Sequence, residues 1–141
     1  GFIGSWLILE EAHVVTIVVS EKYRGYSIGK MLIWAFLKQA VKVVEEKLAD
    51  ETFDFDQFSV DMSTSKSTLH RKLKSLTGLS PGEFIRSVRM KHSLQMLANN
   101  IGNISEIAYS VGFSDPKYFS RCFKNEFGIT PKEWLEKNKR K

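Results

Sequence analysis

Two stretches of the sequence place basic, polar and aromatic side chains at helical spacing. In residues 116–127 four apolar side chains recur at i, i+3, i+4 and i+8 and predict one buried helix face: Phe119, Cys122, Phe123 and Phe127. The opposite face carries side chains that can donate hydrogen bonds: Lys117, Tyr118, Arg121, Lys124 and Asn125. That face is either a plain solvated surface or a surface that binds an anionic partner.

A similar stretch lies upstream, in residues 66–76. Its apolar side chains are Leu69, Leu73 and Leu76, which predict a second buried helix face. Its outward side chains are again basic or polar: Ser67, Thr68, His70, Arg71 and Lys74. Two helices of this kind in one half of the chain favour a repeated functional unit over a chance pattern.

The elements that must position these helices are shorter helices and tight turns. Asn103 is suited to cap a helix over residues 104–111, and Gly112 is suited to end it. Asp115 is suited to cap the following helix, with Pro116 at its first position. Because small residues at Ala108 and Gly112 allow two helices to approach closely, this order is typical of a helix-turn-helix motif. A plain helical hairpin with a charged outer face is the alternative.

The upstream helix is preceded by the same order of elements. We expect a helix over residues 55–62, a turn at 63–65 and a helix cap at Ser65. Ser59 and Ser63 stand where the downstream motif has Ala and Gly. These two polar residues predict a looser upstream turn.

A longer helix is predicted between the two motifs, from Pro81 to about Asn99. Its apolar stripe comprises Phe84, Ile85, Val88, Leu94, Leu97 and Ala98. At about 1.5 Å per residue, such a helix is roughly 27 Å long. A rigid element of that length could hold two exposed helices about one turn of DNA apart, roughly 34 Å.

The first part of the chain has a different character. Residues 1–11 and 12–20 are rich in Val, Ile and Trp and predict two strands, and apolar residues from Lys30 to about Leu48 predict a helix. We therefore expect a small β-β-α segment over residues 1–49 and a mainly α domain over residues 50–141.

Composition and charge limit the possible functions. The chain has 141 residues, a formal net charge of +5 and one cysteine. Residues 1–49 contribute +1 and residues 50–141 contribute +4, so the excess of basic residues lies in the predicted helical domain. A single cysteine excludes an intramolecular disulfide and argues against a Cys-based zinc site. No segment is predicted to cross a membrane, and we expect a cytoplasmic protein without a metal or cofactor.

Residues 50–138 resemble the DNA-binding domain of the AraC/XylS family of bacterial transcription regulators. The resemblance is carried by SKSTLHRKLKSLTGLSPGEFIRSVRM (65–90) and by NISEIAYSVGFSDPKYFSRCFKNEFGITPKEW (103–134). It implies two helix-turn-helix units joined by a long helix, each placing its second helix in a major groove. Within the family, this part is also similar to the output domain of hybrid two-component sensors.

The same resemblance implies which residues contact DNA. The base-reading positions of the family correspond to seven residues of this chain: Ser67, His70, Arg71, Pro116, Lys117, Ser120 and Arg121. Arg71 and Arg121 suit the role best, because a guanidinium can bond to O6 and N7 of guanine together. For Arg71, a salt bridge to an acidic neighbour is the alternative. Candidate phosphate contacts are Lys74, Arg86, Lys124 and the tail 137–141.

Residues 1–48 resemble the acetyl-CoA-binding core of GNAT N-acetyltransferases. The turn RGYSIG matches the family at Arg24, Gly25 and Gly29, whose counterparts bind the pyrophosphate of acetyl-CoA, whereas Ser27 departs from the usual Gly. The remaining strands of that fold are missing from the sequence, so we expect no catalytic residues and no enzyme activity.

Three hypotheses follow from these patterns. The first is a sequence-specific DNA-binding domain of a transcription regulator, with double-stranded DNA as its partner and RNA polymerase as a second partner to consider. The second is a fragment of an acetyl-CoA-dependent N-acetyltransferase. The third is a helical protein-interaction domain. The sequence predicts no oligomeric state.

Overall fold

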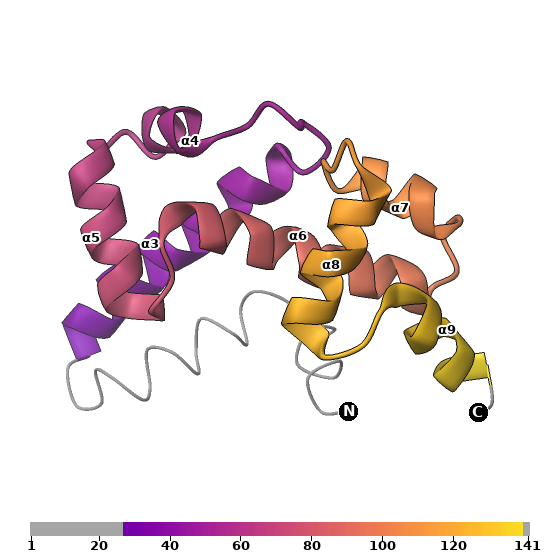
Figure 1. Cartoon of the computed structure of the whole chain (residues 1–141). Helices are drawn as coiled ribbons and strands as arrows, with labels where there is room; N and C mark the ends of the chain where they lie inside the picture. The colour runs from indigo at the N-terminus through magenta and orange to yellow at the C-terminus, as the bar shows by residue number, and fades with distance from the viewer. Residues whose placement is uncertain (1–26, 140–141) are drawn as a thin grey trace. The chain divides into compact units, whose positions relative to one another are not determined.

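The computed structural model describes residues 27–139, with side chains from residue 32 onward, and contains only helices in this range (Figure 1). The helices are α3 (Ser27–Glu46), α4 (Phe55–Asp61), α5 (Lys66–Thr77), α6 (Pro81–Ala98), α7 (Ile104–Ser110), α8 (Pro116–Phe127) and α9 (Pro131–Lys139). The prediction of a mainly α fold is confirmed. The two strands predicted in residues 1–20 lie outside the described residues.

The helix boundaries follow local capping chemistry. The side chains of Asn103 and Asp115 each accept a hydrogen bond from a backbone amide in the first turn of α7 and α8. Ser65 does the same for α5, through the amide of Thr68 at 3.2 Å. Gly78 and Gly128 end α5 and α8 in the left-handed conformation, where glycine carries no steric penalty.

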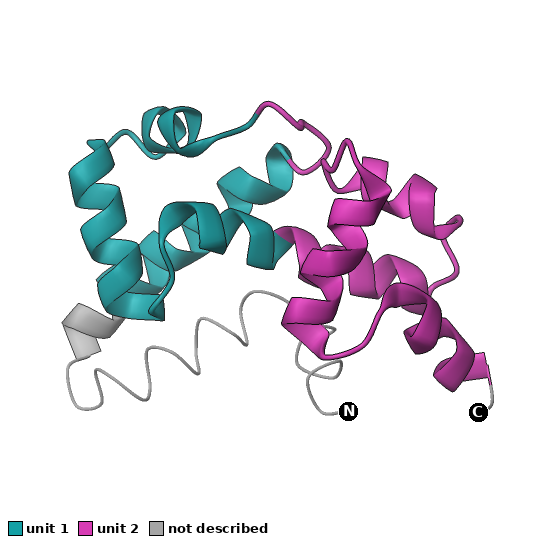
Figure 2. Ribbon diagram, in the orientation of Figure 1, with its two compact units in different colours: residues 1–47, 53–88 teal, residues 48–52, 89–141 magenta. Residues whose placement is uncertain are grey.

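The chain folds as two compact units (Figure 2). Of the described residues, 27–47 and 53–88 form the first unit, and 48–52 and 89–139 form the second. The composition of the sequence predicted a change after residue 49, but α3 belongs to the first unit together with α4 and α5. The reason is that α3 supplies apolar side chains to the core of that unit.

The core of the first unit is built from α3, α4, α5 and the first half of α6. Phe58 and Leu69 are fully buried, and the ring of Phe58 stacks on Phe84 at a centroid distance of 5.9 Å. From α3, Leu37 and Val44 enter the same cluster. Leu32, near the start of the same helix, is 69% exposed and is not part of this cluster.

The core of the second unit is dominated by aromatic rings. Phe113, Phe119, Phe123 and Phe127 form consecutive ring contacts with centroid distances of 5.5, 6.0 and 4.7 Å. Because aromatic pairs prefer tilted or edge-to-face arrangements, these contacts stabilise α8 beyond the burial of their area. Ala98, predicted to be buried in α6, is exposed at the last position of that helix.

Both helix-turn-helix turns contain one residue with positive φ and are closed by the same pattern of backbone hydrogen bonds. Ser63 in the upstream turn has φ +54°, and Gly112 in the downstream turn has φ +87°. In the upstream turn the amide of Thr64 donates to the carbonyl of Ser59 at 3.1 Å, and the equivalent downstream bond is 2.9 Å. The prediction of a looser upstream turn is therefore wrong. The buried hydroxyl of Ser59 is satisfied inside its own helix.

None of the described helices is both long and apolar enough to span a membrane. In the described part of the chain, no three His, Cys, Asp or Glu side chains are placed to bind a metal ion together.

Candidate nucleic-acid interface

Helix α5 exposes a basic face that contains no carboxylate. Its twelve residues include no Asp or Glu, whereas His70, Arg71 and Lys74 are all exposed. Leu69 and Leu73 are fully buried and anchor the opposite face in the first unit, so the orientation of the basic face is fixed. The fourth predicted member of the site, Ser67, is exposed beside the cap residue Ser65, with 3.4 Å between the two hydroxyl oxygens.

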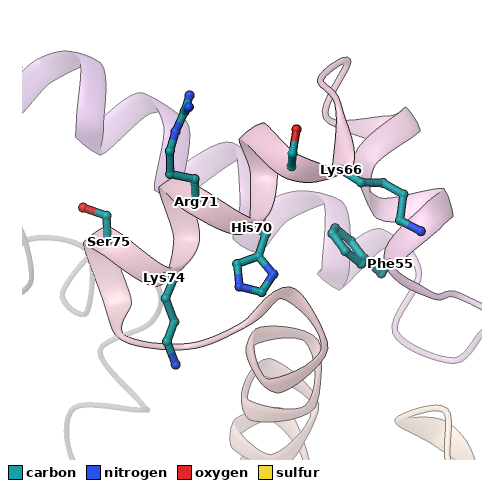
Figure 3. A pocket seen from close by; sticks show the side chains of 7 residues that line it. Phe55, Lys66, His70, Arg71, Lys74 and Ser75 are labelled. Atoms are coloured by element: carbon teal, nitrogen blue, oxygen red, sulfur yellow. The ribbon is translucent and has the colours of Figure 1, made fainter.

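A shallow concavity of about 710 Å³ lies on this face (Figure 3). It is lined by one residue of α4 and by six of α5: Phe55, Lys66, Ser67, His70, Arg71, Lys74 and Ser75. It brings together all four residues that the sequence assigned to DNA contact on α5. The close-up shows Arg71 and Lys74 extending in different directions from the helix, with His70 nearer to Phe55.

The ring of Phe55 contacts two side chains at the start of this face. The ammonium group of Lys66 lies 5.0 Å from the Phe55 ring centroid and also pairs with the carboxylate of Asp56. The ring of His70 lies 6.4 Å from the same Phe55 ring. Neither Phe55 nor Lys66 was assigned to the site from sequence, because their role depends on contact between α4 and α5.

Arg71 has no ion-pair partner within the described part of the chain, so the alternative of a structural salt bridge gains no support there. It lines the concavity and a smaller neighbouring hollow of about 370 Å³, which also involves Phe36 and Lys72. The guanidinium is therefore available to an anionic or hydrogen-bond-accepting partner.

Helix α8 presents the corresponding face in the second unit. Lys117 and Arg121 are exposed, and Pro116 and Ser120 are partly exposed. Phe119 and Phe123 are fully buried and fix the rotation of the helix. The guanidinium carbon of Arg121 lies 5.6 Å from the ring centroid of Tyr118. Tyr118 was predicted to face outward but was not assigned to the site.

The three predicted phosphate contacts are also exposed. Lys74 and Lys124 lie in the last turns of α5 and α8, and Arg86 lies on α6. Cationic side chains near the end of a helix also interact favourably with its carbonyl groups, so exposure alone does not distinguish the two roles. The role of the tail stays a prediction: residues 137–139 are helical, and residues 140–141 lie outside the described residues.

The predicted pyrophosphate site of the N-terminal segment lies mostly outside the described residues and stays a prediction. Arg24 and Gly25 lie outside the described residues. Gly29 lies in the first turn of α3, which begins at Ser27, three residues before the predicted start.

The structural role of Arg89 in the second unit was not predicted from the sequence. Arg89 on α6 is 7% exposed and donates to the carbonyls of Gly112, at 3.2 Å, and Asp50, at 2.7 Å. Burial lowers the pKa of Arg89 from its ordinary value, and the nearby charge of Asp50 opposes that shift. Its guanidinium thereby joins α6, the downstream turn and the segment 48–52. An arginine within an amphipathic helix gives no sequence signal for such a role.

The comparisons with protein families agree with this geometry. Residues 59–137, more than half of the chain, match the family described as "Helix-turn-helix domain". Residues 1–62 match the acetyltransferase (GNAT) family, which covers less than half of the chain.

Two curated proteins are similar to the helical part. The chain is 46% identical over 98 residues to histidine kinase P4 of Formosa agariphila, covering 70% of this chain and 7% of that protein. It is 35% identical over 96 residues to the HTH-type transcriptional activator RhaS of Mannheimia succiniciproducens, covering 68% of this chain and 35% of that protein. The chain thus spans less than a tenth of the first relative and about a third of the second.

A solved structure supports the same assignment. A transcriptional regulator with an AraC-type DNA-binding domain from Chromobacterium violaceum aligns with a TM-score of 0.66 and 27% identity. The alignment covers 72% of this chain and 90% of that chain. On the family match and the paired helix-turn-helix units, the chain belongs to the AraC-type helix-turn-helix family.

Proposed function

We propose that residues 50–141 form a sequence-specific DNA-binding domain of a transcription regulator, which places α5 and α8 in adjacent major grooves of double-stranded DNA. One observation carries this proposal. Arg71 and Arg121 each occupy the sixth position of a twelve-residue helix that stands second in a helix-turn-helix unit, and both are exposed. Two equivalent guanidinium groups on two such helices suit two half-sites better than they suit one small ligand.

The remaining residues divide into two roles in this proposal. Ser67 and His70 on α5, with Pro116, Lys117 and Ser120 on α8, face the base edges beside the two arginines. Lys74, Arg86 and Lys124 bind phosphates, which adds affinity and salt dependence without sequence information.

The parent protein is proposed from the curated relatives. Similarity to a protein named a histidine kinase fits an output domain of a two-component system, and similarity to a protein named a transcriptional activator fits control of transcription. Such a domain acts in the cytoplasm, with RNA polymerase as a candidate second partner. For the GNAT-like part of the sequence we propose no catalytic residue, and its helix α3 serves the first unit by supplying apolar side chains to the core.

Selection from a library of random duplexes tests the proposed function directly. We expect enrichment of a sequence with two conserved segments. For this sequence, log Kd should rise linearly with the logarithm of the salt concentration. Failure to enrich any sequence, together with no binding to duplex DNA at low salt, would overturn the proposal and favour a protein-interaction domain.

An acetyl-CoA-binding function is the second candidate, because residues 1–62 match the acetyltransferase (GNAT) family. In that case Arg24, Gly25 and Gly29 would contact the pyrophosphate. Titration calorimetry with acetyl-CoA distinguishes the two functions. No heat of binding at high ligand concentration would eliminate this candidate and leave DNA binding untouched.

A further inference from the structure

A continuous series of side-chain contacts runs from the core of the second unit to its exposed face. Phe113 is 8% exposed and contacts Phe119 edge-to-face, with ring centroids 5.5 Å apart. The ring of Tyr118 is 5.8 Å from Phe113, and the guanidinium carbon of Arg121 is 5.6 Å from the Tyr118 ring centroid. Tyr118 itself is 43% exposed, so it connects a buried ring to a solvent-facing cation.

The contact with the ring of Tyr118 restricts the conformations of Arg121. A guanidinium over the face of a tyrosine is attracted by the π electrons of the ring. The tyrosine has few rotatable bonds and is supported by a buried phenylalanine, so the position of its ring is well defined. A long side chain that is ordered before binding loses less conformational entropy when it forms two hydrogen bonds to one base.

Helix α5 has no comparable aromatic contact at its exposed arginine, Arg71, within the described residues. The third position of α8 is Tyr118, whereas the third position of α5 is Thr68. The hydroxyl of Thr68 accepts a hydrogen bond from Ser65 at 2.8 Å and thus belongs to the cap of α5. Within the described residues, Arg71 has no aromatic partner at a comparable distance.

We propose that Tyr118 is a positioning residue that orients Arg121 for base recognition, so that α8 discriminates between base pairs more strongly than α5 does. The inference rests on the proposed DNA-binding function and adds to it an unequal division of specificity between the two helices. The ring of Tyr118 is the active feature, and its hydroxyl is not needed.

The test compares Tyr118→Phe, which keeps the ring, with Tyr118→Ala, which removes it. For each variant, Kd is measured for the selected duplex and for a duplex altered at the base pair where Arg121→Ala relaxes specificity. The readout is the Kd for the altered duplex divided by the Kd for the selected duplex, because a general loss of stability does not change this ratio. We expect Tyr118→Ala to lower the ratio about two- to fivefold and Tyr118→Phe to leave it at the wild-type value.

Two controls separate positioning from other roles. On an Arg121→Ala background, Tyr118→Ala should cause no further loss in the ratio, because the two residues act as one unit. Thr68→Ala, the matched variant on α5, should leave discrimination at the base pair assigned to Arg71 unchanged.

Several results would overturn the inference. One is an unchanged ratio in Tyr118→Ala, and another is an equal loss in Tyr118→Phe, which would assign the role to the hydroxyl. Losses that add on the Arg121→Ala background would show independent action, and a loss in Thr68→Ala would remove the contrast between the helices. If the wild-type chain prefers no duplex, the proposed function itself fails, which is a distinguishable result.

Discussion

Arg121 and Lys124 stand one helical turn apart on α8, yet we assign them different tasks. Arg121 is stacked on Tyr118 in the first half of the helix, and Lys124 is exposed in its last turn. A forked guanidinium can recognise two acceptors on one base, whereas an ammonium group acts as a point charge towards phosphate. The two roles therefore predict different effects: loss of Arg121 should weaken binding to the selected sequence more than binding to random DNA, whereas loss of Lys124 should weaken both equally.

We expect Arg121→Ala to weaken binding to the selected duplex by about 1–3 kcal/mol and to relax one base position. Lys124→Ala should weaken binding to selected and random duplexes equally and reduce the slope of log Kd against log salt by about one unit. Fluorescence anisotropy titrations over a range of salt concentrations measure both effects. Equal losses on both duplexes for Arg121→Ala would contradict its assignment.

The two turn residues give a second prediction at this scale. A Cβ on Gly112 would lie 2.6 Å from the carbonyl oxygen of Leu48 and 2.8 Å from the guanidinium carbon of Arg89, at φ +87°. Gly112→Ser should therefore lower the free energy of unfolding by roughly 2–4 kcal/mol.

Ser63→Gly is the matched control in the first unit. Ser63 already has φ +54° and is exposed, so glycine relieves backbone strain but makes the unfolded chain more flexible. We expect the free energy of unfolding to change by less than about 1 kcal/mol. Urea denaturation of both variants is the measurement, and a comparable loss in both would show that the two turns do not differ in this way.

Sequence patterns predicted the exposed residues of the site better than their contacts. The spacing of apolar residues predicted the rotation of α5 and α8, because a stripe of three side chains on α5 and of four on α8 defines a buried face. It did not reveal the contact of Phe55 with Lys66, or that of Tyr118 with Arg121. Such contacts depend on tertiary packing and on rotamers, which have no periodic signal.

At the scale of elements, capping residues explain most of the helix boundaries. The start of α6 is held by a reciprocal pair in which the backbone amide of Ser80 donates to Glu83 at 3.2 Å. The amide of Glu83 donates in turn to the Ser80 hydroxyl at 3.3 Å. The backbone and side-chain hydrogen bonds of Ser80 lower the pKa of Glu83 from its ordinary value, and the charges of Lys74 and Arg86 act in the same direction.

This pair predicts a pH dependence of stability. Because the pKa of Glu83 is lower in the folded state, its stabilising effect is present above pH 4.5 and is lost as the pH falls through the lowered value. Glu83→Gln keeps a hydrogen-bond acceptor but has no charge to titrate. We expect the variant to lose less stability than the wild type between pH 5 and about pH 3. Identical acid profiles in thermal unfolding would contradict the prediction.

The helices differ in how clearly the sequence marks their ends. The boundaries of α5 and α8 agree with the prediction to within one residue, since Gly78 and Gly128 end both helices. Helix α9 passes Trp134 without a break and continues to Lys139. No glycine or proline follows Pro131, and Asn138 bonds to the carbonyl of Trp134 at 2.8 Å, so nothing in the sequence stops the helix earlier.

At the scale of the whole molecule, α6 belongs to both compact units. Residues 81–88 are part of the first unit and residues 89–98 are part of the second. An eighteen-residue helix is about 27 Å long, which is shorter than the roughly 34 Å of one turn of B-form DNA. The predicted boundary at residue 49 differs from these units, because the buried guanidinium of Arg89 binds the carbonyl of Asp50 in the second unit.

The central claim is that two helices read two half-sites on one face of a duplex. The most direct measurement is the Kd for duplexes that carry the two selected half-sites at varied centre-to-centre spacing. We expect the tightest binding at about 10–10.5 base pairs and, after insertion of five base pairs, an affinity no better than that of a duplex with one half-site. Equal affinity at every spacing, or equal affinity for one half-site and two, would contradict the account.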